Sequence, residues 1–469
     1  MKRFNILSVL LLALIWSGCN VFKDLASPPG SVPKMFRNAA PVDSSSVGDL
    51  PFNNFINDFA VQSLIDTALV KNYDMQIALK NIDAAEALFK QSKLGYLPEL
   101  KLQLAASSAR PSDNSLNGLS LNQFTGSTHI EDYSANVGVV WETDIWGKIR
   151  NQKAGALASF LQTEEARKAV QTRLVADVAK GYYNLLMLNA QLEIAKKNLK
   201  LNDSTLHIIN LQFDAGQVTT LAIQQAEAQQ LNAAQLIPLL EQNVALQENA
   251  LSVLVGTMPK AINHSSRLDK MTIPQDLNAG FPSAMLSRRP DIKYAELALN
   301  IANAKVGVAK ASLYPSLVIT ASGGINSFKA SNWFSVPASL FGLVSGGITQ
   351  PIFQRGQLKS NVELAKIDRE KAVIQFRQSV INAVGEVSDE LTRVEKLKNQ
   401  YSIAEKRAQT LQQASKNANL LFKSGMANYL EVITAQGSLL QSELELTRIK
   451  TEQLNAAVGL YRSLGGGWH

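Results

Sequence analysis

Two long stretches without proline constrain the fold of this chain more than any other feature of its sequence. Proline is absent from residues 112–237 and from residues 352–469, although the chain has 15 prolines in 469 residues. Within the first stretch, residues 150–212 are rich in Ala, Leu, Gln, Glu and Lys, which favour helices. One helix over 150–212 would be about 95 Å long, at about 1.5 Å per residue. The sequence therefore predicts helices longer than an ordinary globular core.

Apolar residues in the first predicted helix follow two series with a period of seven. At about 100° per residue, the two series lie on widely separated faces, so this helix should pack against a neighbour on each side. This pattern suits a helix inside a ring of helices. A buried helix in a compact bundle is the alternative, and it would require shorter helices. The first series is Leu192, Leu199, Leu206 and Phe213, and the second is Ile194, Leu201 and Ile208.

Each long helix is predicted to turn back at a glycine. The first breaks at residues 214–217, where Gly216 permits a left-handed cap, and helical character resumes near Thr219. A helix over 357–422 shows the same pattern, with its break around Gly425. The difference in numbering between Gly216 and Gly425, here called the tip offset, superposes the two hairpins and indicates an internal duplication. The superposed pairs are Leu211 and Leu420, Phe213 and Phe422, Gly216 and Gly425, Leu221 and Leu430, Ala226 and Ala435, Leu251 and Leu460, and Gly256 and Gly465.

Two pairs of strands are predicted from alternating apolar and polar residues, at about 99–109 and 132–143 and again at about 315–325 and 339–350. Just upstream, a second and slightly larger offset, here called the entry offset, aligns Pro98 with Pro315, together with Ala85, Ala87 and Lys93 on Ala302, Ala304 and Lys310. Strands of about ten residues with one apolar face suit the lipid-facing wall of a barrel. Four strands cannot close a barrel, so several chains must contribute. Two soluble hairpins capping a helical bundle are the alternative.

The N-terminus is predicted to be an export signal. Residues 1–18 combine Lys2 and Arg3 with an apolar run that ends in small residues. Cys19, the only cysteine of the chain, follows directly, in a placement that resembles a bacterial lipoprotein signal. We therefore predict a lipidated Cys19 at the start of a proline-rich tether over residues 19–57. A signal peptide with a chance cysteine is the alternative.

Enzyme and metal chemistry find little support in the sequence. The four histidines are scattered, the single cysteine excludes sites built on several thiolates, and no GxSxG, Walker A, GxGxxG or EF-hand pattern occurs. We expect no cofactor and no catalytic residues. Charged residues make up 18% of the chain and no run of five basic residues occurs, so nucleic-acid binding is not expected despite a net charge of +7.

Several motifs together resemble the TolC-like outer-membrane factors, in particular the lipoprotein branch typified by OprM and NodT. The resemblance covers essentially the whole mature chain, and its motifs fall where strand ends and hairpin tips are predicted. The motifs are the runs at 287–292, 302–310 and 313–317, the Trp-Glu-Thr-Asp-Ile-Trp-Gly run at 141–147, Pro351-Ile352-Phe353 with Gly356, and Tyr429-Leu430-Glu431-Val432 with Ala435-Gln436.

The resemblance implies an α+β membrane protein that works as a homotrimer. Each chain would lend four strands to a twelve-stranded outer-membrane β-barrel, and the long helices would form a periplasmic α-helical barrel. The first structural repeat would span residues 58–290 and the second 291–469. A mixed collar would come from residues 52–70, 238–290 and the C-terminus. The Arg-Pro-Asp run at 289–291 reads as structural, because Pro290 and Asp291 suit the first turn of a helix.

The implied function is that of a passive exit duct in the outer membrane, within a tripartite efflux system. Its expected partners are outer-membrane lipid, a periplasmic membrane-fusion adaptor and an inner-membrane transporter of the RND type. A function from another class remains open, namely a periplasmic coiled-coil adaptor or structural lipoprotein without a barrel. Six residues at the two hairpin tips are predicted to dock the adaptor, although both glycines could be plain helix caps. The six are Gly216, Thr219, Leu221, Gly425, Tyr429 and Leu430.

The resemblance also implies a gate just after the second tip. The family carries two acidic residues three positions apart there, and the matching positions here are Glu431 and Thr434. Three copies of Glu431 around a narrow axis would form a ring of like charge that attracts cations. The alternative is a solvated glutamate that pairs with a nearby base such as Lys423.

Overall fold

The computed structural model describes residues 33, 35–37, 46–263, 266–272 and 277–468. The predicted signal peptide, Cys19 and most of the tether lie outside these residues. The chain divides into two compact units. One, the strand unit, holds residues 84–161 and 297–374, and the other, the helix unit, holds residues 46–83, 162–296 and 375–469. Among the described helices, none combines the length and apolar character that a membrane span requires.

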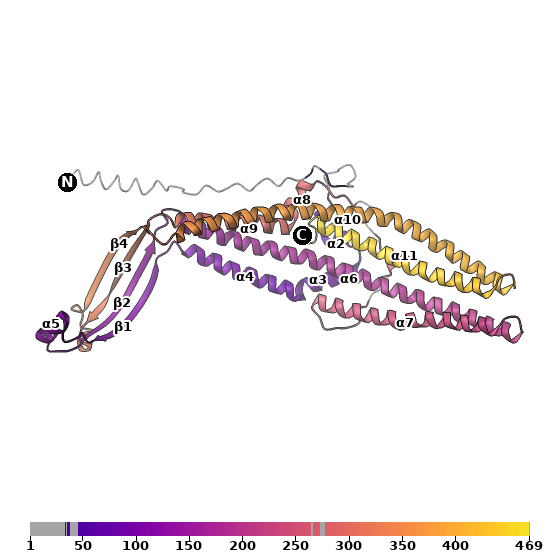
Figure 1. The fold of residues 1–469 in the computed structure, drawn as a ribbon, viewed down its shortest axis with the longest axis horizontal. Coiled ribbons are helices and arrows are strands. Elements are labelled where there is room, and N and C mark those ends of the chain that lie inside the picture. Colours follow the sequence, from indigo (N-terminus) through magenta and orange to yellow (C-terminus); the bar gives the residue numbers. More distant parts are fainter. Residues whose placement is uncertain (1–32, 34, 38–45, 264–265, 273–276, 469) are drawn as a thin grey trace. The chain divides into compact units, whose positions relative to one another are not determined.

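The long helices form two hairpins (Figure 1). Helices α6 (Lys148–Asp214) and α10 (Gln357–Lys423) each contain 67 residues, and α7 (Thr220–Val255) and α11 (Tyr429–Ser463) run back from them. At about 1.5 Å per residue, each of the two longest helices spans about 100 Å. The other helices are η1 (Val47–Asp49), α2 (Phe52–Phe55), α3 (Phe59–Lys71), α4 (Tyr73–Leu94), η2 (Leu268–Lys270), α8 (Pro282–Arg288), α9 (Pro290–Ala311) and η3 (Ala330–Asn332).

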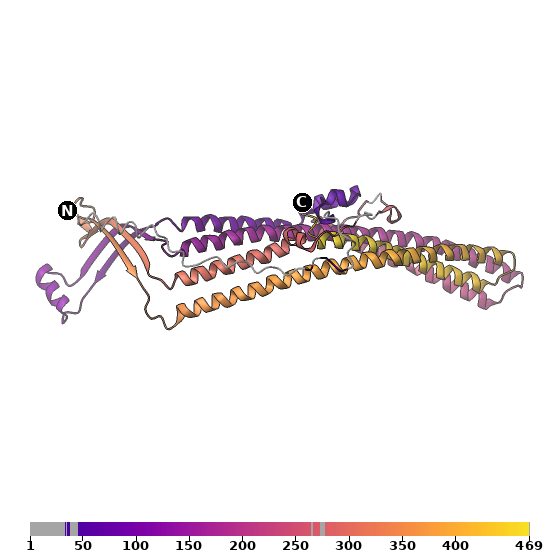
Figure 2. The ribbon, with the colours of Figure 1, turned by 90° about the horizontal axis from the view of Figure 1, so that it is seen from above.

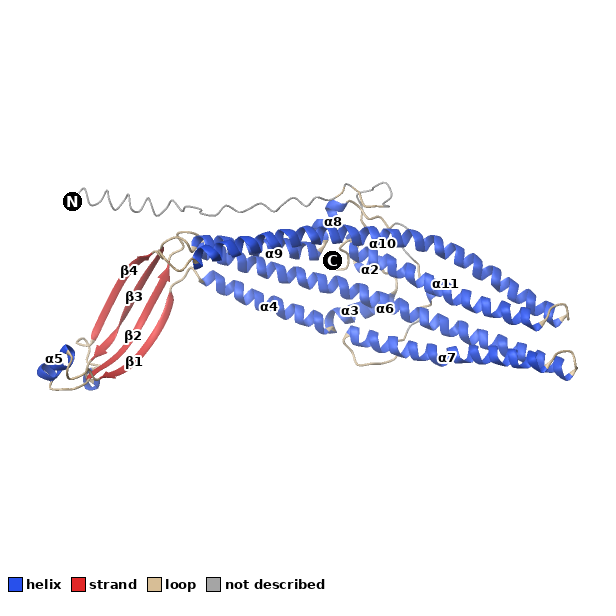
Figure 3. Cartoon of the chain, in the orientation of Figure 1, coloured by secondary structure: helices blue, strands red, loops and turns tan. Residues whose placement is uncertain are grey.

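The strand unit contains one antiparallel sheet in the order β1-β2-β3-β4 (Figure 3). Leu104 of β1 lies opposite Ala135, Ala135 lies opposite Ile325, and Ile325 lies opposite Leu340, so apolar residues of all four strands share one face. The short helix α5 (Leu116–Thr125) joins the first two strands. The strands are β1 (Glu99–Ala109), β2 (Ile130–Glu142), β3 (Ser316–Ser327) and β4 (Leu340–Thr349).

The bounds of these helices confirm the internal duplication. The tip offset carries both ends of α6 onto both ends of α10, and the entry offset carries both ends of α4 onto those of α9. Helix α7, however, continues through Pro238 to Val255. Residues 238–255, which were expected in the collar, thus belong to this helix. The helix continues through Pro238 because its packing compensates for the one backbone hydrogen bond that proline cannot make.

Over residues 192–213 of α6, the buried positions differ from the two predicted apolar series at every residue except Leu192. Leu199 and Leu206 are only half-buried, and Phe213 is exposed. The buried stripe follows the three-and-four spacing of a coiled coil but is largely small or polar. It consists of Leu192, Ala195, Asn198, Asn202, Thr205 and Ile209.

The largest core of the helix unit joins the first short helices to the end of the chain. The ring of Phe55 stacks on Tyr461 with 4.3 Å between centroids, and the Tyr461 hydroxyl donates to the Leu50 carbonyl at 2.6 Å. Val61 and Ile65 of α3 are fully buried in the same cluster, which also includes Tyr182 of α6. This core fixes α6 and α11 to the N-terminal helices of the unit.

Candidate functional site

The first hairpin tip ends α6 with a glycine-based cap. The amide of Gly216 donates to the Phe213 carbonyl and the amide of Gln217 donates to the Gln212 carbonyl, both at 2.8 Å. This pair of bonds satisfies carbonyls that would otherwise lack partners at the helix end. Gly216 has φ of +70°, a conformation that side chains with a Cβ rarely adopt. The turn therefore depends on glycine at this position.

The second tip repeats this geometry, with a stronger start to the following helix. Gly425 has φ of +75° and its amide donates to the Phe422 carbonyl at 3.1 Å. Beyond the turn, Asn428 Oδ1 accepts the amide of Glu431 at 3.1 Å and so caps α11. Its counterpart at the first tip, Thr219, makes no such side-chain bond to α7.

The two tips pack against each other in the helix unit, where the hairpins lie side by side in both views (Figures 1 and 2). The Tyr429 hydroxyl donates to Gln225 Oε1 on the first hairpin at 2.8 Å. Tyr429 is thus half-buried between the hairpins rather than fully presented to a partner. The buried cluster consists of Ile209, Ala222, Ala226, Phe422 and Val432.

Leucine side chains remain exposed at both tips. Leu221 and Leu430 are related by the tip offset, and their exposed fractions are 56% and 54%. Each lies in the first turn of its returning helix. Isolated exposed leucines need no explanation, but the same residue exposed at both repeats marks a surface that can bind an apolar partner. Other exposed apolar residues near the tips are Leu211, Leu420 and Met426.

The predicted gate residues lie on the exposed face of α11. Glu431 is in the first helical turn, where the positive end of the helix dipole favours its negative charge. Its carboxylate makes no salt bridge within the described part of the chain, including with Lys423. Thr434 is also exposed, about one turn further along. The first repeat has Ala222 and Gln225 at the matching positions, so each chain supplies one such acid.

A buried polar seam lies behind the tips and was missed by the sequence interpretation. Asn202 Nδ2 donates to Asn198 Oδ1 at 2.8 Å within α6, and Gln436 Nε2 of α11 donates to Thr205 Oγ1 of α6 at 3.0 Å, which joins the two helices. Gln436 Oε1 is buried without a hydrogen-bond partner among the described residues. The spacing of Asn198, Asn202 and Thr205 was the available signal, but polar residues are usually read as a solvated face.

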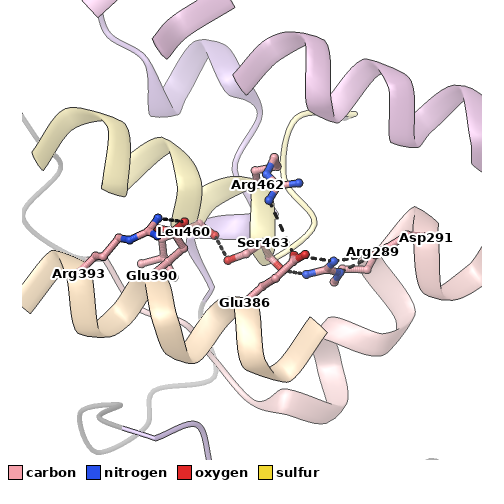
Figure 4. A network of polar contacts seen from close by, with 8 residues as sticks. All are labelled: Arg289, Asp291, Glu386, Glu390, Arg393, Leu460, Arg462 and Ser463. Atoms are coloured by element: carbon pink, nitrogen blue, oxygen red, sulfur yellow. Dashed lines mark hydrogen bonds and ion pairs between the residues drawn. The ribbon is translucent and has the colours of Figure 1, made fainter. Parts of the chain in front are cut away.

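An ion network ties the Arg-Pro-Asp run to the second hairpin (Figure 4). The buried guanidinium of Arg289 contacts Asp291 Oδ2 at 2.6 Å, Glu386 Oε2 at 2.9 Å and the Ser463 carbonyl at 2.8 Å. Burial alone would raise the pKa of Asp291, but the hydrogen bonds and charge of Arg289 hold it below its ordinary value of 3.8. The guanidinium therefore links the start of α9 to α10 and to the end of α11.

One turn further along α10, the carboxylate of Glu390 is only partly hydrogen-bonded. Its Oε1 accepts from Arg393 at 3.0 Å, whereas its buried Oε2 has no hydrogen-bond partner in the described residues. Burial raises the pKa of Glu390, against the opposing charges of Arg393 and Lys180. Within the described ranges, no group of three or more His, Cys, Asp or Glu residues could hold a metal ion. Arg289 and its partners thus join helices, while Glu390 pairs with Arg393 within α10.

Comparisons with known proteins find a family and relatives that match most of the chain. A model of the outer membrane efflux protein family matches residues 64–257 and 281–466. The entry offset relates the starts of these two segments and the tip offset relates their ends. The chain is 30% identical over 472 residues to the probable efflux pump outer membrane protein TtgC of Pseudomonas putida, covering 99% of this chain and 96% of that protein.

Two further likenesses extend this finding. The chain is 28% identical over 471 residues to the probable outer membrane lipoprotein SilC of Salmonella typhimurium, with 100% of both chains covered. Among solved structures, the open state of the Neisseria gonorrhoeae MtrE outer membrane channel matches with a TM-score of 0.86 at 26% identity. That match covers 96% of this chain and 99% of the other.

Proposed function

Because the chain belongs to the outer membrane efflux protein family, we propose that three copies form one exit duct whose hairpin tips bind a periplasmic membrane-fusion adaptor. Family membership makes the chain an outer-membrane channel of an efflux pump, not an enzyme. It also decides against the alternative of a periplasmic adaptor or structural lipoprotein without a channel. In the proposed system the duct conducts passively, and an inner-membrane transporter of the RND type supplies the energy.

The trimer is supported by the incomplete sheet of the single chain. Among the residues that the structure describes, the four strands leave two edges without a partner, and lipid offers no hydrogen bonds to such edges. Three copies supply enough strands to close a barrel. The solved CusC and MtrE channels match the fold of this chain with TM-scores of 0.82 and 0.86.

The observation that carries the adaptor proposal is the matched exposure of Leu221 and Leu430. Two equivalent apolar side chains per subunit would give a trimer six similar docking positions around its periplasmic mouth. Gly216 and Gly425 set the turns that present these side chains. Thr219 flanks the first docking position, and Tyr429 supports the second through its bond to Gln225.

A double substitution tests the docking proposal. Leu221→Asp with Leu430→Asp places charge on both tips, and we expect efflux and adaptor co-purification to fall at least tenfold while trimer yield is unchanged. Leu231→Asp is the matched control, because Leu231 is also exposed on α7 but lies beyond the tip. Wild-type efflux and adaptor binding in the double variant would contradict docking at these residues.

We further propose that Cys19 is acylated and anchors the mature N-terminus in the outer membrane. The proposal is supported by the signal-like residues before Cys19 and by the description of the similar SilC protein as a probable lipoprotein. Several acyl chains on one residue give stable anchoring, since each buried CH2 contributes roughly 0.8 kcal/mol. Mass spectrometry of the mature protein tests this directly. An unmodified Cys19 would refute the anchor without affecting the channel function.

Glu431 is proposed to line the narrow entrance of the duct. Three copies would form a ring of unpaired carboxylates, and Thr434 one turn away would add polar side chains without further charge. Such a ring attracts cations and opposes its own closure. We expect a modest cation preference, because each chain contributes one acid rather than two.

A further inference from the structure

The two faces of the four-stranded sheet carry different kinds of side chains. Leu104, Ala135, Ile325 and Leu340 lie at one level of one face, here called the apolar face. Successive residues of a strand point to opposite faces, so their neighbours along each strand belong to the other face, here called the inner face. Most inner-face residues are polar or glycine. In the proposed barrel the apolar face meets lipid, and the inner face lines the duct.

The charged residues of the inner face all have a polar partner close by. They are Glu99, Lys101, Asp132 and Glu142. The contacts are Lys101 with Glu99 at 3.3 Å, Lys148 with Glu142 at 2.9 Å, and Asn326 Nδ2 with Asp132 at 2.7 Å. Opposite charges that lie side by side largely cancel at a distance. The strands therefore leave one uncompensated charge per chain on this wall, that of Asp132 near the start of β2.

Two large apolar residues interrupt this polar wall. Phe341 and Leu343 lie on the inner face of β4, with Gly324 and Ser322 opposite them on β3. These partners are too small to cover them, and Phe341 and Leu343 are 38% and 61% exposed. The inner face of a barrel is ordinarily polar. A residue that breaks such a local rule marks a place where function is expected.

Neutral hydrogen-bonding groups border these two residues. Ser322 lies opposite Leu343, and Ser345 follows two residues further along the same face of β4. At the level of Phe341, the amide of Asn136 is the next side chain across the sheet, because the residue between them is glycine. An apolar surface bordered by hydroxyl and amide groups suits a molecule that has an apolar body and uncharged polar groups.

We propose that Phe341 and Leu343, here called the inner apolar patch, bind the apolar part of amphiphilic organic solutes as these pass through the duct. This inference rests on the proposed exit duct and adds the class of solute that it carries. Three copies would place three such patches around one lumen. The patch acts by removing apolar area from water, so solutes with larger aromatic or aliphatic parts should be held longer.

A hydrated metal cation would gain little from the same wall. Within the four described strands, the inner face carries no His, Cys or Met, the side chains that suit transition metals. Two of its three carboxylates are already paired, with Lys101 and Lys148. The chemistry of the wall therefore favours organic solutes over metal cations.

Current interruptions in single channels measure how long a solute is held. The full-length protein is inserted into a planar lipid bilayer, and N-phenyl-1-naphthylamine, a neutral aromatic amine, is added as the probe. We expect brief interruptions of the open-channel current, and Phe341→Ser with Leu343→Ser should shorten them at least threefold, because the apolar contact is lost. The duration is read within each open channel, so it does not depend on how many channels insert.

Two control variants separate apolar character from position. Exchange of the two residues, Phe341→Leu with Leu343→Phe, keeps the patch apolar and should keep the durations within twofold of wild type. Val344→Ser changes the next residue along β4, which is 79% exposed on the apolar face, and should leave the durations unchanged.

The outcomes separate the patch from the proposed duct. Wild-type durations in the double serine variant would overturn the patch and leave the duct intact. Uninterrupted current through wild-type channels would also overturn it, and would indicate that another segment of the chain covers the patch. If the double variant opens no channels, Leu343→Ser alone decides by the same criterion. A wild-type protein that opens no channels would refute the exit duct itself.

Thiol labelling tests which face of β4 lines the duct. In a Cys19→Ser background, Leu343→Cys and Val344→Cys each place a single thiol, on opposite faces of the strand. A charged, water-soluble methanethiosulfonate reagent should lower the open-channel current of Leu343→Cys, because the added group projects into the lumen. The same reagent should leave the current of Val344→Cys unchanged. Equal effects on the two variants would contradict the assignment of the inner face and, with it, the inner apolar patch.

Discussion

At the scale of single residues, Arg289 is the side chain with the most consequential contacts. Its guanidinium is buried and joins three segments through Asp291, Glu386 and the Ser463 carbonyl. Hydrogen bonds to charged groups are stronger than neutral ones when both partners are held in place. Most other ion pairs in the described chain link exposed neighbours on one helix, as Lys80 and Asp83 do, and contribute little.

Arg289→Ala should destabilise the protein by about 2 kcal/mol, since three charge-assisted contacts are lost at once. Arg173→Ala is the control, because Arg173 and its partner Asp177 are both exposed on α6 and their ion pair is worth at most about 1 kcal/mol. Thermal unfolding of both variants in detergent, followed by circular dichroism, measures the difference. Equal melting temperatures for the two variants would contradict the role assigned to Arg289.

Asp291 gives this network a defined dependence on pH. Its pKa is lower in the folded protein than its ordinary value of 3.8. The stabilisation is therefore fully present above that value and is lost as the pH falls below about 4, through the folded pKa. We expect wild type to be more stable than Asp291→Asn at pH 7 and the gap to shrink towards pH 3. A gap in melting temperature that stays constant over this range would rule out the charge of Asp291 as the cause.

At the scale of secondary-structure elements, local rules determined much of the fold. The absence of proline predicted the long helices, and Gly216 and Gly425 predicted their ends, because a left-handed cap has few alternatives. The buried seam of α6 was not predictable in the same way. Asn198 donates to the Gln436 carbonyl of α11, and Asn202 in turn donates to Asn198, so the burial of both depends on a tertiary contact that no local pattern specifies.

Contacts between residues far apart in the sequence were not predicted, for the same reason. The bond of Arg289 to Glu386 joins residues 97 positions apart, and no local pattern specifies it. At the tips, the turn glycines and the outward-facing Leu221 and Leu430 were predicted from sequence, whereas the cap of α11 by Asn428 was not. The half-buried position of Tyr429 does not, because it depends on Gln225 of the other hairpin.

Two glycines with the same backbone conformation should respond differently to alanine. Gly216 and Gly256 have φ of +70° and +80°, and a Cβ at Gly216 would meet nothing within 4 Å. A Cβ at Gly256 would collide with the backbone of Lys71 and Asn72. Gly216→Ala should therefore cost about 1–2 kcal/mol of backbone strain alone, and Gly256→Ala should cost clearly more. Melting temperatures in detergent compare them, and an equal loss in both would show that the contact at Lys71 is unimportant.

At the scale of the whole molecule, duplication explains why one chain contains two hairpins of each kind. The two matched segments of the family model and the two sets of helices follow the same two offsets. A trimer of such a chain would contain six similar repeats, yet only the second tip carries an acid after its turn, Glu431. The entrance would then have threefold rather than sixfold charge symmetry.

Glu431→Gln tests this charge pattern in the assembled duct. The substitution removes three carboxylates from the proposed ring, so we expect the reversal potential across a salt gradient to shift towards zero and block by multivalent cations to weaken. Thr434→Ala, which changes no charge, should leave both values near wild type. If Glu431→Gln channels keep the wild-type reversal potential and cation block, Glu431 does not line the entrance.

The most direct test of the account is to record from the purified full-length protein in a planar lipid bilayer. Detergent-extracted protein should be trimeric by light scattering and should open stepwise, ion-conducting channels without any added pump component. Cys19→Ser should conduct as well, since the anchor is separate from the duct. A monomeric protein that inserts without conducting would contradict the assignment as an outer-membrane channel.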